Sequence, residues 1–166
     1  MTTGKAAKKT ADAERQARIQ PLLDYWVPLL GLGDWKITWE LVDKLSGAAW
    51  GGEEAGARVG TVGPYQQAHI KFARSHVDEC VLPYELEHTV IHELGHCLTH
   101  SLQATLREEL TETSGLGREV GWQIETLCDT LATAFWQLRY GTTLPIGYSP
   151  VPVPSPHSGP TITSDM

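Results

Sequence analysis

The chain lacks a long apolar run, paired cysteine spacings and a predominance of basic residues. A membrane-spanning helix needs about 20 mostly apolar residues, so we expect no membrane span. The first residues lack the order of a secretory signal, so we expect a cytoplasmic protein. The three cysteines are an odd number without CxxC spacing, which argues against a disulfide framework or a zinc ribbon. Reduced, buried thiols are expected at Cys80, Cys97 and Cys128.

Basic residues are fewer than acidic ones, 13 against 20, which gives a net charge of −7. The first 20 residues reverse this balance, since they hold five Lys or Arg and two Asp or Glu. The remainder is strongly acidic, which argues against a broad nucleic-acid surface. We therefore expect no nucleic-acid partner and a solvated basic run at the N-terminus.

Length and composition predict one folded domain between two flanking segments. Residues 1–17 are small, polar and basic, and we expect a disordered arm. Residues 18–143 form the expected domain, a comfortable size for one hydrophobic core. Residues 144–166 are rich in Pro, Ser and Thr and are expected to be disordered. This tail is either inert or a docking segment for a protein partner.

Periodicity in the first half of the domain predicts a helix followed by a small sheet. A helix is expected over residues 11–30, interrupted or restarted near Pro21 and Pro28. Alternating apolar residues then predict three strands, at residues 35–42, 58–62 and 67–74. The fold class is therefore expected to be α+β.

The most informative segment is His92-Glu93-Leu94-Gly95-His96, an HExxH motif. On an α-helix, residues four apart lie nearly above one another, so His92 and His96 can place two imidazole nitrogens on one metal ion. Glu93 lies one step round the helix, where it can take a proton from a metal-bound water. This is the arrangement of zinc hydrolases, with Zn2+ as cofactor.

The residues around the motif favour a helix over 83–101. Pro83 suits the first helical turn, and the acidic residues after it suit a helix N-terminus. Six apolar residues fall within one arc beside the two histidines: Leu86, Val90, Ile91, Leu94, Cys97 and Leu98. The simpler alternative is an ordinary amphipathic helix with surface histidines.

A catalytic zinc needs a third protein ligand and an open position for water. A second helix is predicted over residues 121–140, where Glu125 and Asp129 are four apart and share a face. We expect Glu125 to be the third ligand and Asp129 to orient a ligand histidine by accepting a hydrogen bond. The apolar face of this helix is expected to hold Ile124, Leu127, Leu131, Phe135 and Leu138.

Other side chains compete with Glu125 for the third position. His100 lies one turn beyond His96, too far along a continuous helix to close the site unless the helix breaks. Glu108, Glu109 and Glu112 cluster in the connecting segment, where solvent exposure is the simpler expectation. His157 in the Pro-rich tail is a poor candidate.

The combination of HELGH with Glu125-Thr-Leu-Cys-Asp129 resembles the gluzincin metallopeptidases. It is most similar to small phage and bacterial zincins of the ImmA/IrrE type, over residues 35–140. The resemblance implies a minimal zincin fold: an N-terminal helix, a small twisted sheet with its last strand at the cleft edge, the HExxH helix and a C-terminal helix carrying the third ligand. No helix-turn-helix module is present, so a repressor-cleaving role does not carry over. A SprT-like assignment fits less well, because no suitable later histidine follows the motif.

We therefore expect a zinc metallopeptidase acting on a protein or peptide substrate, in the host cytoplasm if phage-encoded. Glu93 is the expected general base, and His92, His96 and Glu125 are the expected metal ligands. Tyr65 and Tyr84 are candidate donors to an oxyanion. Two alternatives stay open: a non-catalytic phage-type accessory or assembly protein that keeps a zincin fold, and a zinc hydrolase of a non-peptide amide.

Overall fold

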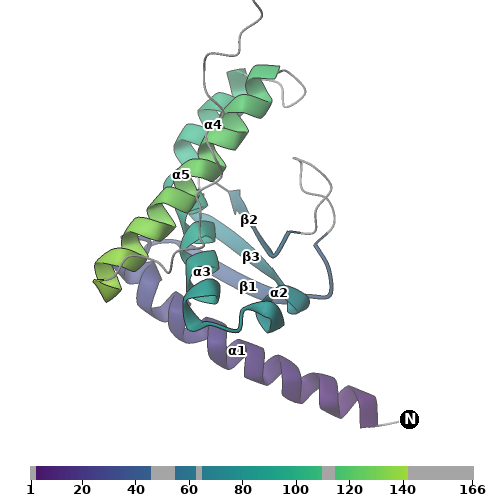
Figure 1. Ribbon diagram of the computed structural model, residues 1–166. Helices are drawn as coiled ribbons and strands as arrows, with labels where there is room; N and C mark the ends of the chain where they lie inside the picture. Colours follow the sequence, from purple (N-terminus) through teal and green to yellow (C-terminus); the bar gives the residue numbers. More distant parts are fainter. Residues whose placement is uncertain (1–2, 46–54, 63–64, 110–114, 142–166) are drawn as a thin grey trace, which may run out of the picture.

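The computed structural model describes residues 3–45, 55–62, 65–109 and 115–141. Over these residues the chain forms five helices and a three-stranded sheet (Figure 1), which confirms the α+β class. In chain order the elements are α1 (Thr3–Leu29), β1 (Lys36–Val42), β2 (Ala57–Val62), β3 (Gln67–Ala73), α2 (Arg74–Glu79), α3 (Pro83–Leu98), α4 (His100–Glu109) and α5 (Gly115–Tyr140). Among the described helices, none has an apolar stretch long enough to cross a membrane.

The sheet has the strand order β1-β3-β2, with β1 parallel and β2 antiparallel to the central β3. The strands lie where the alternation of apolar residues predicted them, except that Arg74 begins α2. The expectation that the last strand lies at the cleft edge is wrong. Because β1 and β2 pair with opposite sides of β3, the edge strand that contacts α3 is β2.

The apolar core lies between one face of the sheet and the helices that cover it (Figure 1). Ala68, Ile70 and Phe72 of β3 are buried at alternate positions, as expected for a strand with one buried face. They join Trp26 of α1 and Ile91 of α3 in one buried cluster. The core therefore fixes α3, the helix that carries the HExxH motif, on the sheet.

The N-terminal segment differs from the expected disordered arm, because α1 begins at Thr3 and includes residues 3–17. The segment is rich in Ala, Lys, Glu, Gln and Arg, which favour a helix. Ion pairs also join it to the rest of the protein: Lys8 with Asp43, Arg15 with Asp78, and Asp12 with Arg74. The helix continues through Pro21 and Pro28 without the predicted interruption, since packing of its buried residues offsets the hydrogen bonds that proline lacks.

The buried face of α5 also differs from the prediction. The buried residues are Cys128, Ala132 and Trp136. Of the predicted stripe, Phe135 packs against the core, whereas Leu127 and Leu138 are 39% and 80% exposed. Small side chains at the contact let α5 approach α3 closely, so the helix turns that face inward instead of its leucines. The same rotation directs the neighbouring acidic residues of α5 towards the motif helix.

Candidate metal centre

The motif helix α3 has well-defined ends that fix the two histidines. Pro83 occupies the first turn, and the Glu85 side chain accepts a hydrogen bond from the Leu82 backbone N–H at 2.9 Å. The helix is continuous from Pro83 to Leu98, so His92 and His96 face the same side, and their Nε2 atoms are 3.2 Å apart. This confirms the helical spacing on which the metal-site prediction depends.

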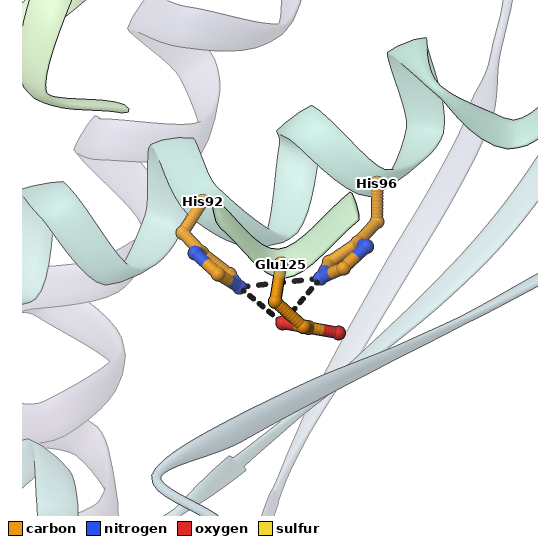
Figure 2. Close-up of side chains that lie close together, drawn as sticks. All are labelled: His92, His96 and Glu125. Atoms are coloured by element: carbon orange, nitrogen blue, oxygen red, sulfur yellow. Dashed lines mark hydrogen bonds and ion pairs between the residues drawn. The ribbon is translucent and has the colours of Figure 1, made fainter. Parts of the chain in front are cut away.

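Glu125 of α5 completes a triangle of donor atoms (Figure 2). Its Oε2 lies 3.2 Å from His92 Nε2 and 3.4 Å from His96 Nε2. The two helices come close at Gly95, where an added Cβ would lie 3.4 Å from Cys128 Cβ and Sγ. There is thus no space at this position for a side chain much larger than alanine while a carboxylate of α5 reaches the histidines of α3.

The dimensions of this triangle fit a tetrahedral metal site. Ligands at roughly 2.0–2.1 Å from zinc are about 3.3 Å from one another in a tetrahedron. The three edges measured here are 3.2, 3.2 and 3.4 Å. Donor atoms this close together repel one another unless a proton or a cation lies between them, so the triangle requires one or the other. Two imidazoles and one carboxylate are the protein ligands of many catalytic zinc sites.

Asp129 lies behind the triangle, where it contacts the other nitrogen of His92. Its Oδ1 is 2.8 Å from His92 Nδ1. An ionised carboxylate can only accept a hydrogen bond, so His92 carries a proton on Nδ1, and Nε2 is the nitrogen that faces the triangle. The neighbouring His88 supports α5 at this level, through an Nε2 contact of 3.2 Å with Thr133 Oγ1.

His96 Nδ1 has two neighbours that the sequence analysis did not identify. Gln103 Nε2 lies 3.2 Å away and Cys128 Sγ lies 3.6 Å away. Gln103 belongs to α4, a helix that was not predicted. It follows His96 by seven residues, or two helical turns, and this spacing is the signal that could have identified it.

Glu93 is separate from the metal triangle and is almost fully buried, with 5% of its surface exposed. Burial raises the pKa of its carboxyl group, although the adjacent charges of His92 and His96 act in the opposite direction. The backbone N–H of Val59 on β2 also hydrogen-bonds to this carboxylate. Its position beside the triangle and its raised pKa suit a group that accepts a proton and returns it.

The ionisation of the site reflects mutual stabilisation of its members. Burial alone would lower the pKa of His92 and His96, but their hydrogen bonds raise it. For His92 the partners are Asp129 and Glu125. For His96 they are Cys128 and Glu125. Burial alone would raise the pKa of Glu125, but its hydrogen bonds to the two histidines lower it to about 2. The carboxylate is therefore ionised at neutral pH, and a cation that binds here must displace a tightly held proton.

The site opens to the surface on its carboxylate side. The side chains of His92 and His96 are only 17% and 13% exposed, whereas those of Glu125 and Asp129 are 45% and 49% exposed. The imidazoles are therefore mostly buried, and the triangle is exposed to solvent on the side of Glu125 and Asp129.

The competing ligands predicted from the sequence do not join the triangle within the described residues. His100 Nδ1 instead contacts Thr61 Oγ1 of β2 at 2.6 Å. Tyr84, a candidate oxyanion donor, packs edge-on against Trp136 in the core. Several candidates fall outside the described part of the chain: the side chains of Glu108 and Glu109, and all of Glu112, His157 and the tail of residues 144–166. All three cysteines are buried and free, as expected.

No protein-family model matches the chain, and neither a curated protein nor a solved structure matches it. A functional conclusion must therefore come from the geometry of the site.

Proposed function

We propose that this protein is a zinc-dependent metallopeptidase, similar to the small gluzincins of the ImmA/IrrE type. The main observation in support is the triangle of His92 Nε2, His96 Nε2 and Glu125 Oε2, whose edges match those of a tetrahedral zinc site. A buried carboxylate, Glu93, lies next to it on the same helix. Together they supply three ligands and a base.

Each residue has a defined part in the proposed reaction. Bound zinc would supply a water of lowered pKa and a Lewis acid for the scissile carbonyl. Glu93 takes the proton of the attacking water and passes it to the leaving amine, which its raised pKa favours. Asp129 holds the His92 ring with Nε2 in the donor triangle, where it would bind the metal.

The edge of β2 that faces away from β3, with which no other described strand pairs, supports a peptide as the substrate. The Ala73 N–H donates a hydrogen bond to the Gly56 carbonyl. In an antiparallel ladder every second residue forms such bonds with its partner strand, so the backbone groups of Ala57, Val59 and Thr61 point away from β3. Val59 is the residue whose N–H reaches Glu93. An extended peptide that pairs with this edge would therefore pass beside the proposed base.

The first test is the metal content of the purified protein and of two variants, His96→Ala and Glu125→Ala. We expect about one zinc per chain in the wild type and loss or weakening of binding in both variants. Glu119→Ala is a matched control, because Glu119 is an exposed acidic residue on the same helix as Glu125. Its metal content should equal that of the wild type.

Hydrolysis is tested separately on an unfolded protein and a library of fluorogenic peptides. We expect cleavage that stops on addition of a chelator and returns with zinc. If zinc binds but peptide cleavage is absent, the site acts on another amide or on no substrate. A wild-type protein that takes up no zinc, even after reconstitution, would contradict the proposal and favour the accessory protein.

A further inference from the structure

The second ligand histidine differs from the first in the group that contacts its Nδ1. His92 Nδ1 lies against the Asp129 carboxylate, which fixes its tautomer. His96 Nδ1 lies against the side-chain amide of Gln103, with Nε2 of the amide at 3.2 Å. An amide can donate from its nitrogen or accept at its oxygen, so the orientation of Gln103 decides which tautomer of His96 is stabilised.

The two orientations have opposite consequences at the metal triangle. When Gln103 Nε2 donates to Nδ1, His96 carries its proton on Nε2 and directs it towards Glu125 Oε2, 3.4 Å away. A protonated Nε2 cannot bind a metal. When the amide turns by 180°, its oxygen accepts the Nδ1–H and the Nε2 lone pair becomes free.

We propose that Gln103 is a positioning residue of the metal centre, whose amide oxygen accepts the Nδ1–H of His96 when Nε2 binds the metal. This inference depends on the metal site proposed above. Thr99 allows the rotation, since its hydroxyl lies 2.8 Å from Gln103 Nε2 and can either accept from that nitrogen or donate to an oxygen in its place. The Gly95 carbonyl, which accepts from the Thr99 hydroxyl at 3.1 Å, keeps its bond from the Thr99 backbone N–H when the hydroxyl turns.

The fold explains why a residue of α4 reaches this histidine. Thr99 lies between α3 and α4, and the backbone bonds Thr99 N to Gly95 O and Gln103 N to Thr99 O continue the helical path through the junction. Gln103 is thus on the same side as His96, and helical side chains lean towards the N-terminus. Cys128 Sγ is the rival acceptor, but it is farther away, at 3.6 Å, and thiol sulfur accepts weakly.

The test compares the zinc affinity of three variants with that of the wild type, by competition with a chromophoric chelator. Gln103→Met removes both ends of the amide but keeps the length of the side chain, and we expect zinc binding about 10- to 100-fold weaker. Gln103→Glu supplies an oxygen acceptor only, and its affinity should stay near that of the wild type. Cys128→Ala removes the sulfur, and its affinity should also stay near that of the wild type.

A direct readout of the His96 tautomer separates positioning from a general structural effect. In zinc-loaded wild type, 15N NMR of the imidazoles should show the His96 proton on Nδ1, shifted by its hydrogen bond. Gln103→Met should lose this shift while its far-ultraviolet circular dichroism and its unfolding midpoint with chelator stay unchanged.

Three results would overturn the inference while leaving the metal site in place. They are unchanged zinc affinity in Gln103→Met, equally weak binding in Gln103→Glu and Gln103→Met, and a loss of affinity confined to Cys128→Ala. A wild type without zinc affinity would instead overturn the metal site, and the inference with it.

Discussion

The carboxylate of Glu93 is not part of the donor triangle, so its proposed role as the base can be tested without removing a metal ligand. We predict that Glu93→Gln keeps the fold and the zinc but lowers the rate of peptide cleavage by about 10²- to 10⁴-fold. Glutamine has nearly the same shape, and its oxygen can still accept the hydrogen bond from the Val59 backbone. It cannot take a proton from water.

The measurement is kcat on a peptide that the wild type cleaves, together with zinc content and the unfolding midpoint. Turnover close to that of the wild type in a zinc-loaded Glu93→Gln would refute the role of Glu93 as the base. Loss of zinc in this variant would show that Glu93 contributes to the metal site.

Residue-scale prediction from the sequence depends on whether the contact is local. The facing of His92 and His96, and of Glu125 and Asp129, follows from four-residue spacing within a helix. The sequence could only suggest that the histidines of α3 meet the acidic residues of α5. In the structure His92 does contact both Glu125 and Asp129. The contact of the Val59 backbone with Glu93 depends on the pairing of β2 with β3, which no local pattern specifies.

At the scale of the elements, α3 and α5 pack closely where Gly95 of α3 faces Cys128 of α5. A Cβ added there would meet Cys128 Cβ and Sγ at 3.4 Å, which is ordinary contact, so alanine fits. We predict that Gly95→Ala retains zinc and is as stable as the wild type or more stable, by up to about 1 kcal/mol, because alanine favours a helix over glycine. Gly95→Leu should be destabilised and should bind zinc weakly, since its side chain would push Glu125 away from the histidines.

Zinc affinity and urea unfolding of the two variants check this prediction. Equal damage from alanine and leucine would mean that the backbone at Gly95, and not the available space, matters.

A second contact between elements is the buried carboxylate of Glu87 on α3. It accepts hydrogen bonds from Trp26 Nε1 of α1 and from Tyr140 Oη of α5, both at 2.8 Å, and it pairs with Arg139. The Arg139 guanidinium also lies 3.8 Å from the centre of the Tyr25 ring. This cluster therefore joins α1, α3 and α5 at the end of the core away from the donor triangle.

We predict that Arg139→Met lowers the free energy of unfolding by about 3 kcal/mol, because it leaves a buried charge without its cation. Urea unfolding at pH 7 measures this loss. The neighbouring Leu138→Ala is the control, since Leu138 is 80% exposed and should change stability by less than about 0.5 kcal/mol. Adding Glu87→Gln to Arg139→Met should recover part of the loss, and a further fall in stability would contradict the proposed pairing.

Elements were predictable from the sequence where one face is buried and the other is not. The strands and α3 have this pattern, and they lie where it placed them. It failed for α5, because leucines occupy the exposed side while Cys128 and Ala132 pack inward. The N-terminal half of α1 has no apolar stripe, and its helix is tied to the body by ion pairs between residues distant in sequence, such as Arg15 with Asp78.

At the scale of the whole molecule, the donor triangle links α3 to α5, so a metal bound there would couple its binding to folding. Zinc that binds only the folded chain stabilises it, by about 2.7 kcal/mol when free zinc is 100 times Kd. The size of this effect depends on pH, because protons compete with the metal for His92 and His96.

The two forms of the protein should respond to pH in opposite directions. Although burial alone would lower the folded-state pKa of the two histidines, their hydrogen bonds raise it above the ordinary value of 6.5. The partners are Asp129 and Glu125 for His92, and Cys128 and Glu125 for His96. In chelated protein, this contribution to stability is fully present below pH 6.5 and is lost as the pH rises through the raised pKa. Zinc needs the deprotonated rings, so its affinity should increase by about tenfold per pH unit for each proton released.

The difference in Tm between zinc-loaded and chelated protein should therefore be larger at pH 8 than at pH 6. Thermal unfolding at both pH values, at the same free zinc concentration, measures it. Glu125→Ala, which lacks the third ligand, should show a small difference at either pH. A difference in the wild type that is independent of pH, or larger at pH 6, would mean that zinc stabilises the protein through groups other than these histidines.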